Sequence, residues 1–201
     1  MTSTDQPPTE LRRLWDLPLR LFHWALVVCV ITGFLLGKFG PNVMTLHFYA
    51  GYCVAGLLVF RIFWGFAGSR PARFGHFLFG PKKTLGYVAD MFKRNPSYWP
   101  GHNPIGALSV FALLGVLLAQ VGTGLFIDAD DFINTGPFAS WVSYETAREA
   151  ASLHYRLSYA LLALVVLHLG AILFYRFWKR ENLVKPMVTG WKEVRKDHPD
   201  V

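Results

Sequence analysis

Four of the seven histidines in this chain lie inside long apolar stretches, where an ionisable side chain is costly and is usually retained for a function. Two of them, His154 and His168, belong to the stretch 153–174 and are 14 positions apart. On a helix, 14 steps return close to the same face and advance by about 21 Å. The other two are His23 and His47. Imidazole nitrogens are common metal ligands, so the arrangement of the helices that carry these rings decides the chemistry.

Four apolar stretches predict helices that cross a lipid bilayer, because about 20 apolar residues span its hydrocarbon core. Hydrophobic residues make up 53% of the chain and charged residues only 16%, which is typical of a membrane protein. No cleavage pattern follows the first stretch, so we expect an uncleaved span rather than a signal peptide. The short connections predict an all-α fold, an integral membrane four-helix bundle in up-down-up-down order. The expected spans are 19–36, 45–67, 105–127 and 153–174.

The uneven distribution of basic residues predicts the orientation of these spans. The net charge is +7, and Lys and Arg are frequent in both tails and in the connection 68–103. The other two connections hold Lys38 and Arg148. Cytoplasmic loops carry the excess of basic residues, so both termini are expected in the cytoplasm. The basic total is explained by a membrane lipid partner, and no nucleic acid partner is expected.

The chain is expected to have three parts. Residues 1–15 form a polar cytoplasmic tail, residues 16–180 contain the four spans, and residues 181–201 form a second cytoplasmic tail. Within the basic connection, residues 81–93 predict a short amphipathic helix at the membrane surface, because their apolar residues share one face.

The orientation also assigns a depth to each histidine. The first span enters from the cytoplasm, so His23 is shallow on the inner side. The second and fourth spans enter from outside, so His47 and His154 are shallow on the outer side, and His168 is on the inner side. The four rings therefore sort into an inner pair, His23 with His168, and an outer pair, His47 with His154.

Two imidazoles that face each other at one depth can fill both axial positions of one haem iron, with the porphyrin in the apolar interior of the bundle. The chain has no C-x-x-C-H motif, so covalent attachment is excluded and two non-covalent haem b groups are expected. Such irons have no open position for oxygen or substrate and exchange only electrons. The two irons would lie about 21 Å apart along the fourth span, which makes an electron path across the membrane.

Other functions for these histidines fit the sequence less well. A histidine in a span can be a hydrogen-bonded packing residue, but matched depths for all four disfavour that explanation. A single zinc or copper site needs converging ligands, and ligands about 21 Å apart on one helix cannot converge. A proton relay favours carboxylates, and none of the spans carries Asp or Glu in its middle. His76, His102 and His198 lie in polar segments and are expected at the surface, although His102 is also a candidate contact for a quinone or a propionate.

Three arginines are candidates for pairing with haem propionates. Arg61 lies 14 positions after His47, so it shares the face of that histidine at the depth of the inner haem. A guanidinium can bind a propionate through two hydrogen bonds, although snorkelling of Arg61 to the cytoplasmic surface is an equal alternative. Arg20 on the inner side and Arg156 on the outer side are further candidates, with ordinary surface charge as the alternative for each.

Four stretches carry a family resemblance: WDLPLRLFHW around His23, HFYAGYCVAGLLVFRIFWGFAG from His47, GHNPIGALSV opening the third span, and LHYRLSYALLALVVLHLG with the last two histidines. In them the chain resembles the prokaryotic cytochrome b561 family, which includes the b-type cytochrome subunits of nickel-iron hydrogenases. The likeness covers about residues 14–180. It implies that residues 16–180 are a four-span di-haem cytochrome b domain whose iron ligands are the four histidines in the pairs given above.

The resemblance also implies a function. Family members transfer electrons across the bacterial cytoplasmic (inner) membrane between a quinone, ubiquinone or menaquinone, and a periplasmic redox partner such as a c-type cytochrome or a hydrogenase. They are electron-transfer cytochromes of respiratory chains rather than substrate-converting enzymes. One branch oxidises superoxide with quinone as acceptor, so a superoxide:quinone oxidoreductase is the alternative, although the acidic connection 128–150 would repel superoxide. A membrane anchor without redox function is a second alternative.

Overall fold

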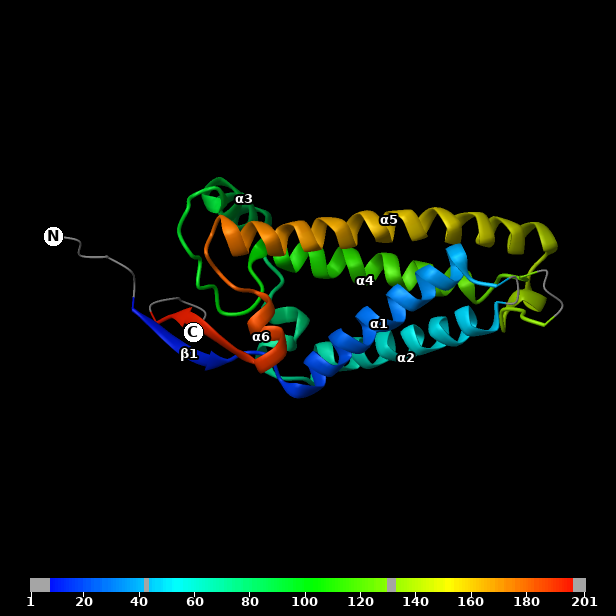
Figure 1. Ribbon diagram of the computed structural model, residues 1–201, viewed down its shortest axis with the longest axis horizontal. Coiled ribbons are helices and arrows are strands. Elements are labelled where there is room, and N and C mark those ends of the chain that lie inside the picture. Colours follow the sequence, from blue (N-terminus) through cyan, green and yellow to red (C-terminus); the bar gives the residue numbers. More distant parts are fainter. Residues whose placement is uncertain (1–7, 42–43, 130–132, 197–201) are drawn as a thin grey trace. The chain divides into compact units, whose positions relative to one another are not determined.

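The computed structural model describes residues 8–41, 44–129 and 133–196 and is mostly helical (Figure 1). Four of its helices are long and apolar enough to cross a membrane, which confirms the expected fold class. His198 and two acidic residues of the last connection, Asp130 and Asp131, lie outside the described residues. The four long helices are α1 (Leu17–Phe39), α2 (Thr45–Ala67), α4 (Pro104–Gly124) and α5 (Tyr144–Phe177).

The ends of α2 agree with the predicted span, whereas α5 starts nine residues before its predicted span. The early start of α5 follows from its N-terminal cap. The hydroxyl of Ser143 accepts a hydrogen bond from the backbone N–H of Thr146, over 3.3 Å, and Glu145 stands in the first turn, where a negative charge is favourable. The helix thus continues into a polar segment that hydropathy alone excludes.

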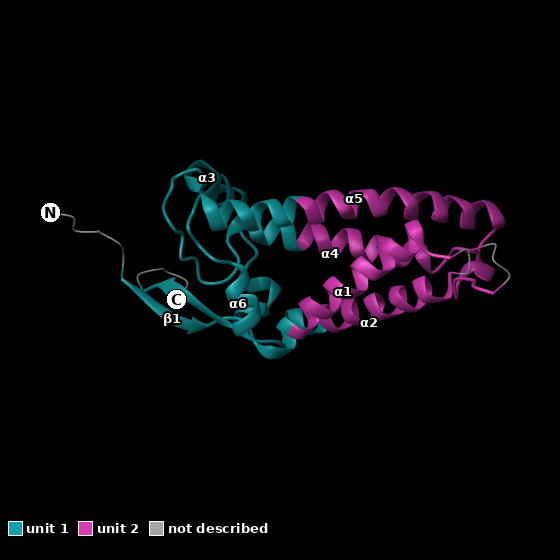
Figure 2. Ribbon diagram, viewed as in Figure 1, with its two compact units in different colours: residues 1–20, 63–110, 167–201 teal, residues 21–62, 111–166 magenta. Residues whose placement is uncertain are grey.

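The chain forms two compact units, and each is described by itself (Figure 2). The unit drawn in magenta contains Leu21–Ile62 and Phe111–Val166, and we call it the histidine-pair unit. Parts of all four long helices meet in it around a buried core, with Val54 and Leu58 from α2, Leu117 from α4 and Leu161 from α5. Apolar side chains of α1 such as Val30 pack against this core. The unit is therefore a four-helix bundle.

The teal unit contains Met1–Arg20, Phe63–Val110 and Leu167–Val201, and we call it the terminal unit. Its short helices are α3 (Pro81–Met91), which confirms the predicted amphipathic helix, and α6 (Val184–Thr189). Two 3-10 turns, η1 (Arg70–Ala72) and η2 (Phe74–His76), follow α2, and a third, η3 (Ala139–Trp141), belongs to the histidine-pair unit.

A two-stranded sheet joins the two tails within the terminal unit. Strand β1 (Thr9–Arg13) pairs antiparallel with β2 (Trp191–Arg195), so that Thr9 lies opposite Arg195. No strand was expected in either tail. The pairing partners are about 180 positions apart in the chain, and neither segment has a long alternating apolar pattern that would predict a strand by itself.

Asp16 begins α1 and links it to the segment after α2. Its carboxylate accepts hydrogen bonds from the backbone N–H of Leu19, over 2.8 Å, from Nε1 of Trp64, over 3.1 Å, and from the hydroxyl of Ser69. Burial alone would raise the pKa of Asp16, but these hydrogen bonds hold it below its ordinary value. Asp16 is therefore an N-cap of α1 that also makes tertiary contacts.

A buried ion pair fixes the loop before α4 to the C-terminal segment. Nζ of Lys192 lies 2.9 Å from Oε1 of Glu181 and donates a second hydrogen bond to the backbone oxygen of Trp99. The hydroxyl of Ser97 donates to Oε2 of Glu181 over 2.7 Å. Burial would raise the pKa of Glu181, but the Lys192 ammonium and the hydrogen bonds from Ser97 bring the pKa below its ordinary value.

Candidate functional site

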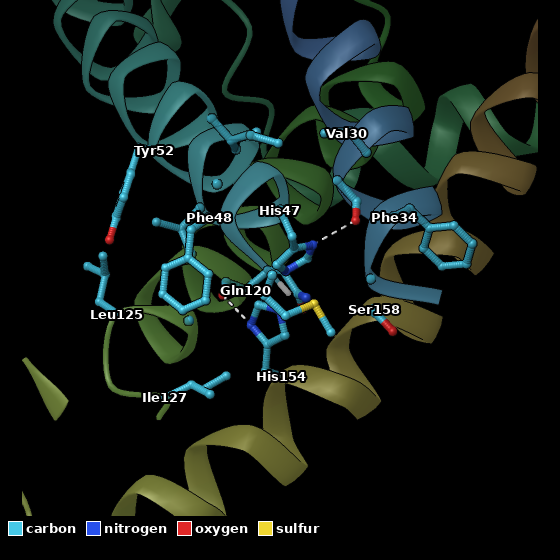
Figure 3. Close-up of a pocket in the computed structure, with 18 of the residues that line it drawn as sticks. Val30, Phe34, His47, Phe48, Tyr52, Gln120, Leu125, Ile127, His154 and Ser158 are labelled. Atoms are coloured by element: carbon cyan, nitrogen blue, oxygen red, sulfur yellow. Dashed lines mark hydrogen bonds between the residues drawn. The ribbon is translucent and has the colours of Figure 1, made fainter. Parts of the chain in front are cut away.

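His47 and His154 face each other inside the histidine-pair unit (Figure 3). His47 stands in the first turn of α2 and His154 in the third turn of α5. Their ring centroids are 6.0 Å apart, and the ring planes meet at 77°. The structure thus brings together the two histidines that the sequence assigned to the outer pair.

Each imidazole of this pair is oriented by a backbone carbonyl of a neighbouring helix. Nδ1 of His47 lies 2.8 Å from the backbone oxygen of Gly33 on α1, and Nδ1 of His154 lies 2.9 Å from that of Gln120 on α4. In each ring, a proton on Nδ1 is donated to the carbonyl oxygen, and the lone pair is left on Nε2. This is the usual arrangement around a metal-binding histidine.

Two glycines let the helices approach these rings closely. A Cβ added at Gly37 would lie 3.0 Å from Cε1 of His47, and one added at Gly124 would lie 3.2 Å from Cε1 of His154. Both distances are tighter than ordinary van der Waals contact, so a larger residue would displace a ring. Glycine at these positions keeps each imidazole against its neighbouring helix.

The paired rings border a cavity of about 410 Å³ whose walls come from the histidine-pair unit. The walls are mainly apolar, with Phe34 and Phe48 among the larger side chains (Figure 3). Ligand cavities of this size and character are typical of cofactor sites between the helices of a bundle. Among the described residues, the charged and polar lining side chains are Lys38, Gln120, Asp128, Ser158 and the two histidines, with Tyr52 and Tyr155.

The outer pair fits the axial ligation of a haem iron. A metal–imidazole bond is about 2 Å long and the ring centre lies roughly 1 Å behind the bonded nitrogen, so two axial rings place their centroids about 6 Å apart. The observed separation is 6.0 Å. The apolar walls suit a porphyrin, and the Nδ1 hydrogen bonds leave both Nε2 atoms for the metal.

The inner pair is divided between the two units, since His23 belongs to the histidine-pair unit and His168 to the terminal unit. Its pairing therefore stays a prediction of the sequence. Within its own unit the ring of His23 meets the ring of Trp24 edge to face, with centroids 5.1 Å apart. Arg61, on the same helix face as His47, is only 2% exposed, so its guanidinium is enclosed by protein.

The other two candidate arginines lie in different surroundings. Nη1 of Arg20 donates a hydrogen bond to the backbone oxygen of Val188, over 2.8 Å, and so ties the start of α1 to α6. Arg156 is exposed, and its Nε approaches the backbone oxygen of Ser152 at 3.4 Å. Arg156 borders a separate groove beside Glu149 and is not among the residues that line the cavity of the histidine pair.

Sequence reasoning missed several residues of this cavity. Lys38 lines it, although it was counted only as one of the few basic residues of an outer connection. A signal was present: Lys38 follows His23 by 15 positions, which places it near the same helix face at the outer depth. The carbonyls of Gly33 and Gln120 left no such signal, because any residue carries a backbone oxygen.

His102 differs from its expected place at the surface. Its ring packs between those of Trp15 and Phe77, with centroid distances of 4.7 Å and 4.6 Å. The residue is half-buried inside the terminal unit, because its imidazole closes a small aromatic cluster.

The chain is similar to known proteins over most of its length. The chain is 25% identical to a probable Ni/Fe-hydrogenase B-type cytochrome subunit of Azotobacter chroococcum, over 93% of this chain and 90% of the relative. It is 26% identical to a probable Ni/Fe-hydrogenase 1 B-type cytochrome subunit of Escherichia coli, over 89% of each chain. No solved structure gives a significant match. The family model of prokaryotic cytochrome b561 matches residues 14–190. Four apolar helices, a facing histidine pair and this match together show that the chain is a membrane protein of the prokaryotic cytochrome b561 family.

Proposed function

We propose that the protein is a di-haem cytochrome b that moves single electrons across the bacterial cytoplasmic membrane, between the quinone pool and a redox partner on the periplasmic side. Membership of a b-type cytochrome family implies haem b as the cofactor. The observation that carries the proposal is the outer pair, with imidazole centroids 6.0 Å apart and both Nδ1 atoms bound to backbone carbonyls. That geometry matches two axial ligands of one iron.

The second haem of the proposal is bound by His23 and His168 on the inner side. The 14-position spacing of His154 and His168 on α5 supports it, because the same spacing puts the two irons about 21 Å apart along the helix. Both termini are proposed to be cytoplasmic, from the excess of Lys and Arg in the tails and in the second connection. Arg61 is the proposed partner of an inner propionate, and its enclosure by protein supports that role over snorkelling.

The polypeptide contributes metal ligands, their orientation and an apolar surrounding. Haem b, when bound, supplies reversible one-electron chemistry at its iron. His47 and His154 would hold the haem through their Nε2 atoms. The carbonyls of Gly33 and Gln120 keep each ring in one tautomer and one orientation. The walls around the rings are mainly apolar, which suits a porphyrin.

The proposed partner is a periplasmic hydrogenase or a c-type cytochrome. Relatives that match about nine tenths of the chain carry the name of Ni/Fe-hydrogenase B-type cytochrome subunits, which favours a hydrogenase. Among the described residues of the last connection, Asp128, Glu145 and Glu149 outnumber Arg148. Such an acidic surface would attract a basic partner. Ubiquinone or menaquinone is the proposed small redox partner.

The test is the haem content and spectrum of the purified protein. We expect a b-type reduced-minus-oxidised spectrum, two haems per chain, and low-spin iron signals of bis-histidine ligation. When the protein is placed in vesicles, its haem should be reduced in the presence of a quinol and should stay oxidised without it. A protein without a haem band would leave only the anchor function. Rapid haem reduction by superoxide, with electrons passing on to quinone, would instead favour the superoxide:quinone oxidoreductase.

A further inference from the structure

Lys38 occupies a position that the ligand pair does not explain. It stands in the last turn of α1 and lines the cavity of the histidine pair. Its Nζ lies 3.8 Å from the ring centre of Tyr155 and 4.1 Å from that of Tyr159, both on α5. The two phenol groups hydrogen-bond to each other over 3.1 Å. The ammonium is therefore held by an aromatic pair instead of extending freely from the helix end.

Lys38 belongs to one side of the cavity. Phe34 and Ser158 lie on one side of the imidazole pair, and Leu125 and Ile127 lie on the other (Figure 3). Lys38 follows Phe34 by one helical turn, and its Nζ lies 6.0 Å from the Phe34 ring centre, so the cation belongs to the first side. Lys38 is the only lysine or arginine among the described residues that line the cavity.

Asp128 also lines the cavity and is the carboxylate among its described lining residues, whereas Lys38 is the cation. An anionic group on a bound molecule would be attracted toward Lys38 and repelled from Asp128. The hydroxyl group of Tyr155 also borders the cavity beside the cation and adds a polar group there, whereas the hydroxyl of Ser158 donates to the backbone oxygen of Tyr155 over 2.7 Å.

We propose that Lys38 binds a propionate of the outer haem and thereby decides which way the macrocycle is turned in its cavity. The inference rests on the proposed function, because it needs haem between His47 and His154. Tyr155 and Tyr159 are positioning residues, since they hold the ammonium at the cavity. Arg156, the residue that the sequence suggested for this role, borders the separate groove and takes no part.

The test compares haem b with its dimethyl ester, which has the same ring and iron but no carboxylate charge. Full-length protein from haem-deficient cells is loaded in detergent with either compound. The affinity for each compound is measured from the spectral signal of the outer haem, which is the signal that depends on His47. We expect the wild type to bind the ester about 10-fold more weakly, because a charge-assisted hydrogen bond is lost. In Lys38→Met the preference for the free acid should disappear, and in Lys38→Arg it should return.

Two further variants make the outcome decisive. Arg148→Gln removes an exposed cation of α5 outside the cavity, and it should keep the full preference. Arg156→Gln should also keep it. The proposal is overturned if Lys38→Met retains the preference, as expected when Lys38 only contacts lipid headgroups, or if Arg156→Gln abolishes it. Failure of the wild type to bind either compound would instead contradict the proposed function.

A redox titration gives an independent readout. Removal of a cation beside the haem stabilises the oxidised, more positive form, so the midpoint potential of the outer haem should fall in Lys38→Met and recover in Lys38→Arg. Arg148→Gln is again the control and should leave the potential unchanged. An unchanged potential in Lys38→Met would count against a propionate contact.

Discussion

The backbone oxygen of Gln120 lies 2.9 Å from Nδ1 of His154, so a residue of α4, a helix without a histidine, orients an imidazole of α5. Gly33 of α1 does the same for His47 of α2, over 2.8 Å. Each ring of the outer pair is thus fixed by a helix other than its own. The register of all four long helices therefore determines whether the two rings can share one iron.

The first prediction concerns the pairing of ligands. His47→Ala and His154→Ala should each remove the outer haem and leave most of the inner one, because either substitution deletes one axial ligand of the same iron. His23→Ala and His168→Ala should remove the other haem. Haem content and low-temperature spectra of the four variants check this. If His47→Ala and His154→Ala removed different haems, the outer pair would not be the ligand set.

The second prediction concerns the close approach at Gly37. Gly37→Val should crowd His47, because even a Cβ at this position would lie 3.0 Å from the ring. Overpacking of this kind typically costs about 1–3 kcal/mol. We expect weaker binding of the outer haem and altered iron signals in electron paramagnetic resonance. Gly56→Val on α2 is the matched control, because an added Cβ there meets nothing within 4 Å. Equal effects of both substitutions would contradict the prediction.

The third prediction concerns the buried pair of Glu181 and Lys192, whose side chains are 5% and 8% exposed. Removal of one partner from such a pair typically costs about 3–5 kcal/mol. Glu181→Gln should therefore lower the thermal stability of the protein in detergent. Glu193→Gln, an exposed neighbour on β2, should have little effect and serves as the control.

The fourth prediction is a pH dependence from the same carboxylate. The pKa of Glu181 is lower in the folded protein than its ordinary value, chiefly because Lys192 and Ser97 outweigh the effect of burial. Its stabilising contribution is thus complete above the unfolded pKa of about 4.3 and is lost as the pH falls through the lower folded pKa. The melting temperature of the wild type should fall more steeply below about pH 4.3 than that of Glu181→Gln. Parallel curves for the two proteins would contradict this.

The fifth prediction concerns the cap at Asp16. Asp16→Ala removes a helix N-cap, which typically costs about 1 kcal/mol, and it also leaves the indole of Trp64 and the hydroxyl of Ser69 without this acceptor. We expect a lower melting temperature and greater solvent quenching of tryptophan fluorescence. Asp16→Asn keeps an acceptor oxygen and should lose less. A melting temperature unchanged by Asp16→Ala would show that the cap contributes nothing.

The spans could be predicted because hydropathy follows the residues of one helix, and it located α2 at both ends. The alternating direction of the spans predicted that His47 and His154 lie near each other, and their rings are in contact in the structure. Contacts between distant segments had no such pattern. The position of Lys38 at the cavity depends on how the end of α1 meets α5, and the aromatic packing of His102 depends on residues from two other segments.

The antiparallel pairing of Thr9–Arg13 with Trp191–Arg195 has a consequence for biogenesis. The strand that leaves the ribosome first has no partner until the strand made last has been released. The pairing also requires both ends of the chain to be on one side of the bilayer, so insertion must produce an even number of crossings. This small sheet therefore forms only in a chain whose two tails have reached the same side of the membrane.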